Sequence, residues 1–493
     1  MKTNDDKPPP IAMSARKQRA AAGDAAEVNA RWAAVIMAAG EGSRMKSAVP
    51  KVAHTLAGLP IVRHVVEATR EAAIDNCIVV VGPDAAADLV RTAAGDGVSF
   101  AVQKQRLGTG DAVASARDAA GEAEYVLIMN GDVPLVLPST LTRLMAAVER
   151  RDGANEPVWP DLALLTAEVA VEAYGFLELT GNRVTSIVET KETDEIDRAA
   201  LVHINSGQYA VRADWLWAHL PRIEPAANGE RYLTQLATMA HAEGNPAFAV
   251  RAADPNEVRG INDRVQLAEA EEILRHRIRR AHMLAGVTIV DPASTFIDAG
   301  VSIGAETTLE PGIHLRGATT IGSGCTIGPT TDVRDSSIGD ACVVRYSTID
   351  ESTLEAHVEM GPYSHLRPGS YICEGVHIGN YVEVKASRLG PRTKMGHFSY
   401  IGDAEVGADV NIGAGTITAN YDGEKKHRTK IGDGAFIGSD TMLVAPVNIG
   451  AGASTSAGSV VNRDVPPGMI AIGAPARIRA RSDAREKEPD AGR

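Results

Sequence analysis

The stretch from Leu389 to Gly423 reads LGPRTKMGHFSYIGDAEVGADVNIGAGTITANYDG and decides the fold of the C-terminal half. An apolar residue followed by glycine recurs through it at close to every sixth position, as at Met395, Ile401 and Ile412. A period of six is neither helical nor the alternation of an ordinary strand. It predicts a β-helix whose turns have three short faces, with one buried aliphatic residue per face and a glycine or small residue at the corner.

The same register extends along the chain on both sides of this stretch, with slips of one residue. Its members are Ile303, Leu309, Leu315, Ile321, Ile327, Val333, Met360, Leu366, Ile372, Ile378, Val384, Ile431, Ile437, Leu443 and Ile449. Such turns bury a core by stacking on one another. A polar excursion over residues 419–430, in which NYDG is followed by Lys425, Lys426, His427 and Arg428, interrupts the register. We interpret it as a loop leaving the coil, where a substrate site is expected.

The N-terminal half has a different pattern. The run AAVIMAAG over residues 33–40 lacks polar alternation, which is typical of a buried parallel strand. Further strands are expected at residues 77–81, 100–103 and 125–129, separated by helical stretches at 84–94 and 111–120. This alternation predicts a doubly wound α/β sheet, whose ligands lie beyond the carboxyl ends of its strands.

Composition narrows the class of protein. The 493 residues are enough for two or three domains, and the formal net charge of −13 argues against general nucleic-acid binding. The sequence contains no run of about 18 apolar residues, so no membrane span is expected. The first 30 residues are polar and are expected to form a disordered tail. The cysteines form no CxxC pair, which indicates reduced thiols in a cytoplasmic protein. They are Cys77, Cys325, Cys342 and Cys373.

Candidate phosphate and metal groups follow the expected strands. The turn GEGSRM precedes Lys51 and contains Arg44, so it is either a phosphate-binding turn or a plain structural one. Asp132 ends the strand YVLIMNGD, where it would hold Mg²⁺ or cap the next helix. Gln103 precedes the turn at Gly108, and an amide there could read a nucleobase edge. In the C-terminal half, His397 is a surface or filler residue of the coil unless its neighbours, such as Tyr400, make it a catalytic base.

Taken together, the motifs resemble known families. AAGEGSRM, Pro50-Lys51, QxxxLGTG, GDVP, INSG and GIND, over residues 31–263, are similar to those of sugar nucleotidyltransferases. A hexapeptide coil carrying RPG, GNYVEVKAS and NIGAGTITANYDG resembles an acyltransferase. Both sets in this order, over roughly residues 31–475, resemble the bacterial bifunctional family that acetylates glucosamine-1-phosphate and uridylylates N-acetylglucosamine-1-phosphate. The resemblance implies a left-handed parallel β-helix and a cytoplasmic homotrimer.

For the N-terminal half, the resemblance implies a site for UTP and the sugar phosphate. The residues that it places on UTP or the UDP-sugar are Ala38, Ala39, Gly40, Lys51, Gln103, Gly108, Thr109, Gly175, Glu189, Asn205 and Asn262. Arg44 and Lys51 would act on the phosphates, and Asp132 with Asn262 would hold Mg²⁺.

For the C-terminal half, the resemblance makes His397 the general base of acetyl transfer. It places glucosamine-1-phosphate against Arg367, Lys385, Tyr400, Asn411 and Lys426, with Tyr400 and Asn411 lining one pocket. It places acetyl-CoA along Ala414, Asn420, Tyr421, Ser439 and Ala457.

The expected organisation is a tail at 1–30, a uridylyltransferase domain at 31–263, a linker helix at 264–286, a β-helix acetyltransferase domain at 287–475 and a tail at 476–493. A partner-binding or membrane-surface helix is the alternative for the linker. The chain departs from the family pattern at Phe176, Asp111, Gln235 and Ala474, with Arg477 or Arg479 as candidates to replace an arginine near the coenzyme 3′-phosphate. Two rival functions remain: a single-activity nucleotide-sugar pyrophosphorylase whose coil only oligomerises, and a non-enzymatic regulatory assembly.

Overall fold

The computed structural model describes residues 31–40, 42–149, 159–170, 175–188 and 201–480. The chain divides into two compact units, with the boundary between Leu274 and Arg275. No helix in the described ranges is both long and apolar enough to span a membrane.

The first unit is built on one nine-stranded sheet with the order β5-β4-β1-β6-β10-β7-β11-β9-β8. Strands β5, β4, β1 and β6 run parallel, and β10 runs antiparallel to β6. The strands are β1 (Trp32–Met37), β4 (Cys77–Val81), β5 (Ser99–Val102), β6 (Tyr125–Asn130), β7 (Leu162–Ala170), β8 (Phe176–Thr180), β9 (Arg183–Val188), β10 (Leu201–Arg212) and β11 (Phe248–Arg251), beside a hairpin of β2 (Thr55–Leu56) and β3 (Leu59–Pro60).

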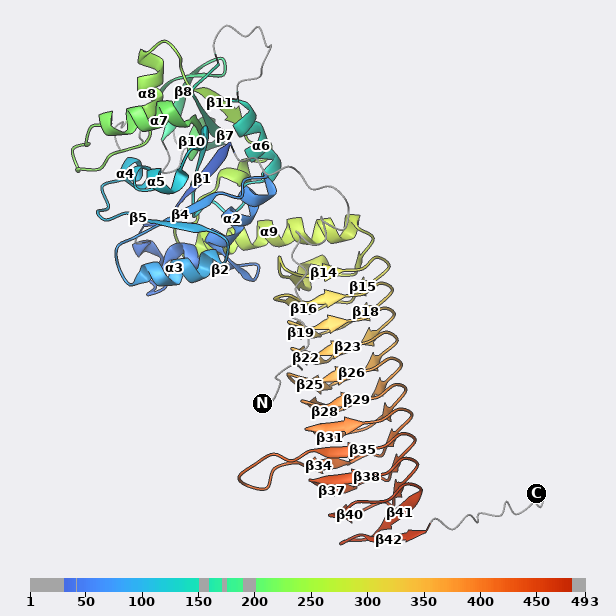
Figure 1. Cartoon of the computed structure of the whole chain (residues 1–493). Coiled ribbons are helices and arrows are strands. Elements are labelled where there is room, and N and C mark those ends of the chain that lie inside the picture. The colour runs from blue at the N-terminus through green and yellow to red at the C-terminus, as the bar shows by residue number, and fades with distance from the viewer. Residues whose placement is uncertain (1–30, 41, 150–158, 171–174, 189–200, 481–493) are drawn as a thin grey trace. The chain divides into compact units, whose positions relative to one another are not determined.

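Both faces of this sheet are covered, as Figure 1 shows. Along β1, Trp32, Ala34 and Ile36 pack into one core, and Ala33 and Val35 pack into the other. This explains the absence of polar alternation, because a strand buried on both faces has no polar side. The helices are α2 (Ile61–Glu71), α3 (Ala86–Ala94) and α6 (Pro138–Ala146) on one core, and α4 (Thr109–Ala114), α5 (Arg117–Ala120), α7 (Ala213–His219) and α8 (Gln235–Ala242) on the other. Short 3₁₀ turns are η1 (Ser43–Met45), η2 (Lys51–Ala53), η3 (Leu220–Arg222) and η4 (Pro255–Val258). The predicted doubly wound α/β domain is confirmed.

The second unit is a parallel β-helix, seen as stacked coils in Figure 1. We call its three sheets the first, second and third faces. The first face holds β12 (Thr288–Ile289), β15 (Thr308–Leu309), β18 (Thr326–Ile327), β21 (Val343–Val344), β24 (Glu359–Met360), β27 (His377–Ile378), β30 (Lys394–Met395), β33 (Asn411–Ile412), β36 (Phe436–Ile437), β39 (Ser454–Thr455), β41 (Met469–Ile472) and β42 (Arg477–Ala480). The second face holds β13 (Thr295–Ile297), β16 (Ile313–Arg316), β19 (Asp332–Arg334), β22 (Thr348–Asp350), β25 (His365–Leu366), β28 (Val382–Lys385), β31 (Ser399–Gly402), β34 (Ile417–Ala419), β37 (Met442–Val444) and β40 (Val460–Val461). The third face holds β14 (Ser302–Ile303), β17 (Thr320–Ile321), β20 (Ser337–Ile338), β23 (Thr353–Leu354), β26 (Tyr371–Ile372), β29 (Arg388–Leu389), β32 (Ala404–Val406), β35 (Thr429–Ile431) and β38 (Val447–Ile449).

The periodic aliphatic residues form the core of this coil. Met395, Ile401 and Val406, one from each face of a single turn, are almost completely buried and belong to one continuous cluster. Because each inward residue stacks on its equivalent in the next coil, the core grows by repetition. The hexapeptide interpretation is confirmed.

The helix α9 (Arg264–Leu284) contains the boundary between the units. In the first unit, Ala270 packs in a small cluster with Leu56 and Ile61. In the second unit, the guanidinium of Arg275 donates to the carbonyl of Ile297 at 3.0 Å, and Ile278 packs against the coil core. At the other end, β42 pairs antiparallel with β41, so ordered structure continues past residue 475.

Candidate functional site

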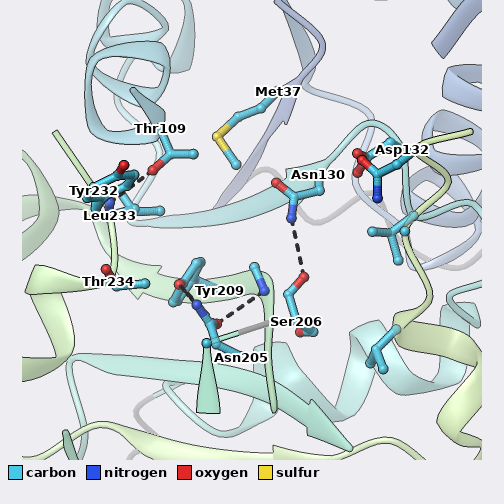
Figure 2. A pocket seen from close by; sticks show the side chains of 16 residues that line it. Met37, Thr109, Asn130, Asp132, Asn205, Ser206, Tyr209, Tyr232, Leu233 and Thr234 are labelled. Atoms are coloured by element: carbon cyan, nitrogen blue, oxygen red, sulfur yellow. Dashed lines mark hydrogen bonds between the residues drawn. The ribbon is translucent and has the colours of Figure 1, made fainter. Parts of the chain in front are cut away.

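A cavity of about 280 Å³ opens at the carboxyl ends of β1 and β6 in the first unit. Figure 2 shows the polar side chains that surround it. Its lining comprises Met37, Thr109, Asn130, Asp132, Val133, Gly175, Asn205, Ser206, Gly207, Tyr209, Tyr232, Leu233, Thr234, Val258, Gly260 and Asn262. Five of these were predicted from the sequence. Asn130, Tyr209 and Tyr232 were missed, although the first two flank the motifs GDVP and INSG.

Four predicted charged and amide groups meet at one side of the cavity. The ammonium of Lys51 forms an ion pair with the Asp132 carboxylate and donates to Asn262 Oδ1 at 3.0 Å. The guanidinium of Arg44 donates to the same amide oxygen at 2.8 Å. The backbone N–H of Ile261 donates to the carbonyl of Asp132 at 2.9 Å, which ties the Asn262 segment to the end of β6. Residues far apart in the sequence thus form one cationic and carboxylate cluster.

The donor set of Asp132 and Asn262 fits a hard divalent cation. A carboxylate oxygen and an amide oxygen are ligands that Mg²⁺ prefers, and Mg²⁺ completes its shell with water and substrate phosphates. No cluster of three acidic, histidine or cysteine side chains suited to a metal occurs among the described residues. The Lys51 ammonium lies between the same two oxygens, which shows that this position attracts a cation.

A second group of amides lines the cavity floor. Asn205 donates from Nδ2 to the Tyr209 hydroxyl at 2.9 Å, and its Oδ1 accepts from the backbone of Gly207 at 3.1 Å. The backbone of Asn205 donates to the carbonyl of Gly175 at 2.8 Å. Gly207 has a φ of 76°, and a Cβ there would lie 2.1 Å from Asn130 Nδ2. A side chain at residue 207 would therefore be strained at this φ and would displace the Asn130 amide.

The predicted nucleobase segment lies at the end of β5. Gly108 has a φ of 100°, and a Cβ there would lie within 2.7 Å of the backbone of Arg231. Thr109 accepts from the backbone of Leu233 at 2.9 Å through its hydroxyl. Ala38 and Ala39 are buried at the end of β1, and Gly40 is exposed with open space where a Cβ would be. The predicted Glu189 lies outside the described residues.

Two of the departures from the family pattern have structural roles here. The amide of Gln235 bonds both backbone groups of Glu224, at 2.8 and 3.1 Å, and so holds a loop. Phe176 begins β8, where it pairs with Ile204.

The second candidate site lies on the second face of the coil, at the edge toward the third face. Arg367, Lys385 and Gly402 occupy equivalent positions on successive coils. The Arg367 guanidinium donates to Glu383 at 2.8 Å, which raises the pKa of Arg367. The proximity of Lys385 lowers the pKa of Lys426, whose side chain comes from the loop that Figure 1 shows leaving the coil after β34. Adjacent ammonium groups repel each other and therefore favour a bound dianion such as a phosphate monoester.

The loop is braced at its base. Asn420 is buried and donates to the Asp403 carboxylate, and Tyr421 bridges to Lys426 in an antiparallel pair. The Asp422 carboxylate accepts from the backbones of Glu424 and Lys425 and from His427, contacts that lower its pKa. Lys426 is thereby held beside the coil.

A Gly402→Ala substitution tests this packing. A Cβ at residue 402 would lie 2.3 Å from the Tyr400 hydroxyl and 2.9 Å from Asn420 Nδ2. The Tyr400 ring is the movable partner, so we expect little loss of stability but a rise of about tenfold in the KM for a phosphate-bearing ligand of this cationic cluster. The measurement is the steady-state KM of Gly402→Ala, compared with that of Tyr400→Phe, which removes only the hydroxyl that the new Cβ would displace. An unchanged KM would show that Tyr400 does not contact this ligand.

The other edge of the second face carries a column of small residues below His397. The strand register pairs Lys394, Asn411, Phe436 and Ser454 on successive coils, and His397, Ala414, Ser439 and Ala457 each follow three residues later. Consecutive members are therefore one coil apart, about 4.8 Å. The His397 ring is exposed, and no described group hydrogen-bonds to it. The column therefore places three small side chains in line with an exposed imidazole.

Asn411 lies elsewhere. It begins β33 on the first face, whereas Tyr400 lies on β31 of the second face. Within one chain a corner of the coil separates them. The structure therefore does not place the two residues on one face of the coil.

Comparison with known proteins identifies the family. The profile of the MobA-like NTP transferase domain matches residues 34–252. The "Bifunctional protein GlmU" of Trichlorobacter lovleyi is 45% identical over 446 residues, covering 89% of this chain and 95% of that protein. Those of Heliobacterium modesticaldum and Streptococcus agalactiae are 44% and 40% identical, covering 89% and 92% of this chain and 94% and 98% of theirs.

The chain belongs to the bifunctional GlmU family. As a GlmU protein it is an enzyme with a nucleotidyltransferase domain, and that domain implies a divalent metal. Membership favours two activities over the single-activity alternative and excludes the non-enzymatic assembly. The similarity to the GlmU relatives covers both the α/β unit and the coil.

Proposed function

We propose that the second unit transfers acetyl from acetyl-CoA to glucosamine-1-phosphate, and that the first unit then transfers uridylyl from UTP to the N-acetylglucosamine-1-phosphate. The observation that carries this proposal is the convergence of Arg44, Lys51, Asp132 and Asn262 at the end of the parallel strands. The product is UDP-N-acetylglucosamine, a precursor of the bacterial cell wall. UTP and acetyl-CoA are cytoplasmic metabolites, so we assign the enzyme to the cytoplasm.

In the first reaction centre, a phosphate oxygen of the sugar attacks the α-phosphorus of UTP and pyrophosphate leaves. Arg44 and Lys51 neutralise the negative charge that accumulates on the phosphates. Asp132 and Asn262 would hold Mg²⁺, which supplies charge neutralisation at the α-phosphate. Lys51 would then leave the Asp132 carboxylate and bind phosphate. Asn205 and Gly175, with the predicted Glu189, orient the sugar, and Gln103 with the Gly108–Thr109 turn holds the uracil.

In the second reaction centre, the sugar amine attacks the thioester carbon of acetyl-CoA. His397 takes the proton from the amine, and the coenzyme leaves as a thiolate that gains a proton. Arg367, Lys385 and Lys426 hold the sugar phosphate at one edge of the second face, with Tyr400 between them and His397. Acetyl-CoA lies along Ala414, Ser439 and Ala457, with Asn420 and Tyr421 of the loop beside it.

The coenzyme 3′-phosphate requires a cation near Ala474. Arg477 and Arg463 line one hollow with Ala474, whereas Arg479 does not. Of the two candidates from the sequence, we therefore assign the 3′-phosphate to Arg477, with Arg463 as a second cation in the same hollow.

The experiment that tests the pair of activities is one assay with purified protein, glucosamine-1-phosphate, acetyl-CoA, UTP and Mg²⁺. Free thiol and pyrophosphate are followed separately. We expect both products, and no pyrophosphate when Mg²⁺ is removed with a chelator. Pyrophosphate without thiol would leave the coil as an oligomerisation module only.

We further propose that the coil assembles into a homotrimer with shared acetyltransferase sites. Asn411 requires a neighbouring chain to reach the Tyr400 face. An aromatic ladder, defined as Tyr346, Tyr363, Tyr381 and Phe398, stands exposed at the corner between the first and second faces, with ring centroids of consecutive tyrosines 5.4 to 5.5 Å apart. Exposed apolar rows of this kind mark protein interfaces.

A Tyr381→Arg substitution tests the assembly. The charged side chain would have to be desolvated in the interface, so we expect dissociation to monomers in analytical ultracentrifugation and loss of most thiol release, with pyrophosphate release retained. Tyr371→Arg on the third face is the matched control. A trimeric Tyr381→Arg variant would place the interface on another part of the coil.

A further inference from the structure

Gln103 is an almost completely buried amide whose two donors are both used. Only 4% of its surface is exposed. Its Nε2 group donates to the Gly108 carbonyl at 3.0 Å and to the Asp111 carboxylate at 3.0 Å. Asp111 is on α4 and replaces the histidine that the family pattern has at this position.

These partners fix which way the amide points. A carbonyl oxygen and a carboxylate oxygen are acceptors only, so the side chain must turn its NH₂ group toward them. The reversed amide would set Oε1 against two acceptors inside the protein, where unmatched polar groups are costly. Among the described residues Oε1 has no hydrogen-bond partner. The amide therefore offers a ligand one acceptor and no donor.

We propose that Asp111 is a positioning residue that sets the nucleobase preference of the uridylyltransferase by locking Gln103 as an acceptor. This inference rests on the proposed function, which places uracil against Gln103. The ring N3–H of uracil can donate to the fixed Oε1. The N3 of cytosine is itself an acceptor, so in the same pose two lone pairs would face each other.

Asp111 is the partner that can be changed, because the Gly108 carbonyl belongs to the backbone. An asparagine at residue 111 can offer its own NH₂ group to Gln103, which removes the penalty for a reversed amide on that side. Gln103 can then present its NH₂ group to a base, and a ring acceptor such as cytosine N3 becomes acceptable. The side chain keeps nearly the same size, so packing around α4 is preserved.

The test compares kcat/KM for UTP and for CTP in pyrophosphate release by the full-length enzyme with Mg²⁺. We expect wild type to prefer UTP strongly and Asp111→Asn to lower the UTP:CTP ratio by about tenfold or more, partly through better use of CTP. Asp118→Asn, the same change on the exposed surface of α5, should leave the ratio as it is. Calorimetric binding of UTP and CTP without sugar phosphate should show the same change in preference.

A double mutant separates positioning from a general structural effect. Because Asp111 acts through the amide, Asp111→Asn should leave the UTP:CTP ratio unchanged in a Gln103→Ala background. A ratio that survives Asp111→Asn in the single variant, or that falls equally in both backgrounds, would overturn the inference. Wild-type protein that releases no pyrophosphate from UTP would instead overturn the proposed function.

Discussion

Asp132→Asn is expected to reduce pyrophosphate release by about 10³-fold while leaving thiol release unchanged. The substitution keeps the shape of the side chain but removes the charge that pairs with Lys51 and that would hold Mg²⁺ with Asn262. Metal-assisted charge neutralisation contributes several kcal/mol to reactions of phosphate esters, and about 4 kcal/mol corresponds to this factor. The measurement is initial rates of both products at saturating substrates.

Two controls give this result its meaning. Thiol release reports the second unit in the same tube, so its persistence shows that the protein is intact. Asp88→Asn, on the exposed side of α3, applies the same chemical change away from the cavity. A Mg²⁺ titration adds a separate readout, since Asp132→Asn should raise the Mg²⁺ concentration needed for half-maximal rate. Asp132→Asn retaining more than about a tenth of the wild-type rate would contradict a metal-ligand role.

His397→Ala is expected to lower thiol release by about 10²- to 10⁴-fold, the usual contribution of a general base. Pyrophosphate release from UTP and supplied N-acetylglucosamine-1-phosphate should be unaffected, because that reaction uses the first unit. The reason is that the strand register puts His397 at the end of the column of small residues, where its ring is exposed and has no hydrogen-bond partner in the described part of the chain.

The matched control is His377→Ala. His377 is an exposed histidine on the preceding coil of the first face, and it pairs with Glu359 at 3.0 Å. Loss of activity in both variants would indicate damage to the coil instead of loss of a base. Loss in neither would assign proton removal to solvent or another group.

Both folds could be predicted from the sequence because buried positions recur at a regular spacing. One inward aliphatic per face, as at Met395 and Ile401, fixes the coil register, and the unbroken apolar run of β1 follows from cover on both faces. Residue type also pointed to Lys51 and Asp132, since phosphates and metals demand cations and carboxylates.

Contacts between particular side chains could not be predicted from the sequence. The contact of Asp111 with Gln103 depends on the turn that brings α4 back to β5, and the family pattern offered no analogue. Motif spacing does not record that contact. The separation of Asn411 from Tyr400 is different, because it follows from the sixfold register: Tyr400 precedes Ile401 on the second face and Asn411 precedes Ile412 on the first.

The excursion between β34 and β35 has a consequence for how such enzymes diversify. The coil resumes its register below the loop, with Ile417 paired to Met442 and Ala404 paired to Thr429. The inserted residues therefore alter no core contact of the stack, whose stability comes from each coil and its neighbours. Loops of other lengths and charges could be exchanged beyond the buried Asn420, whose bond to Asp403 braces the base, at little cost to folding. Substrate range can thus drift by insertion and deletion in the loop while the stacked scaffold stays constant.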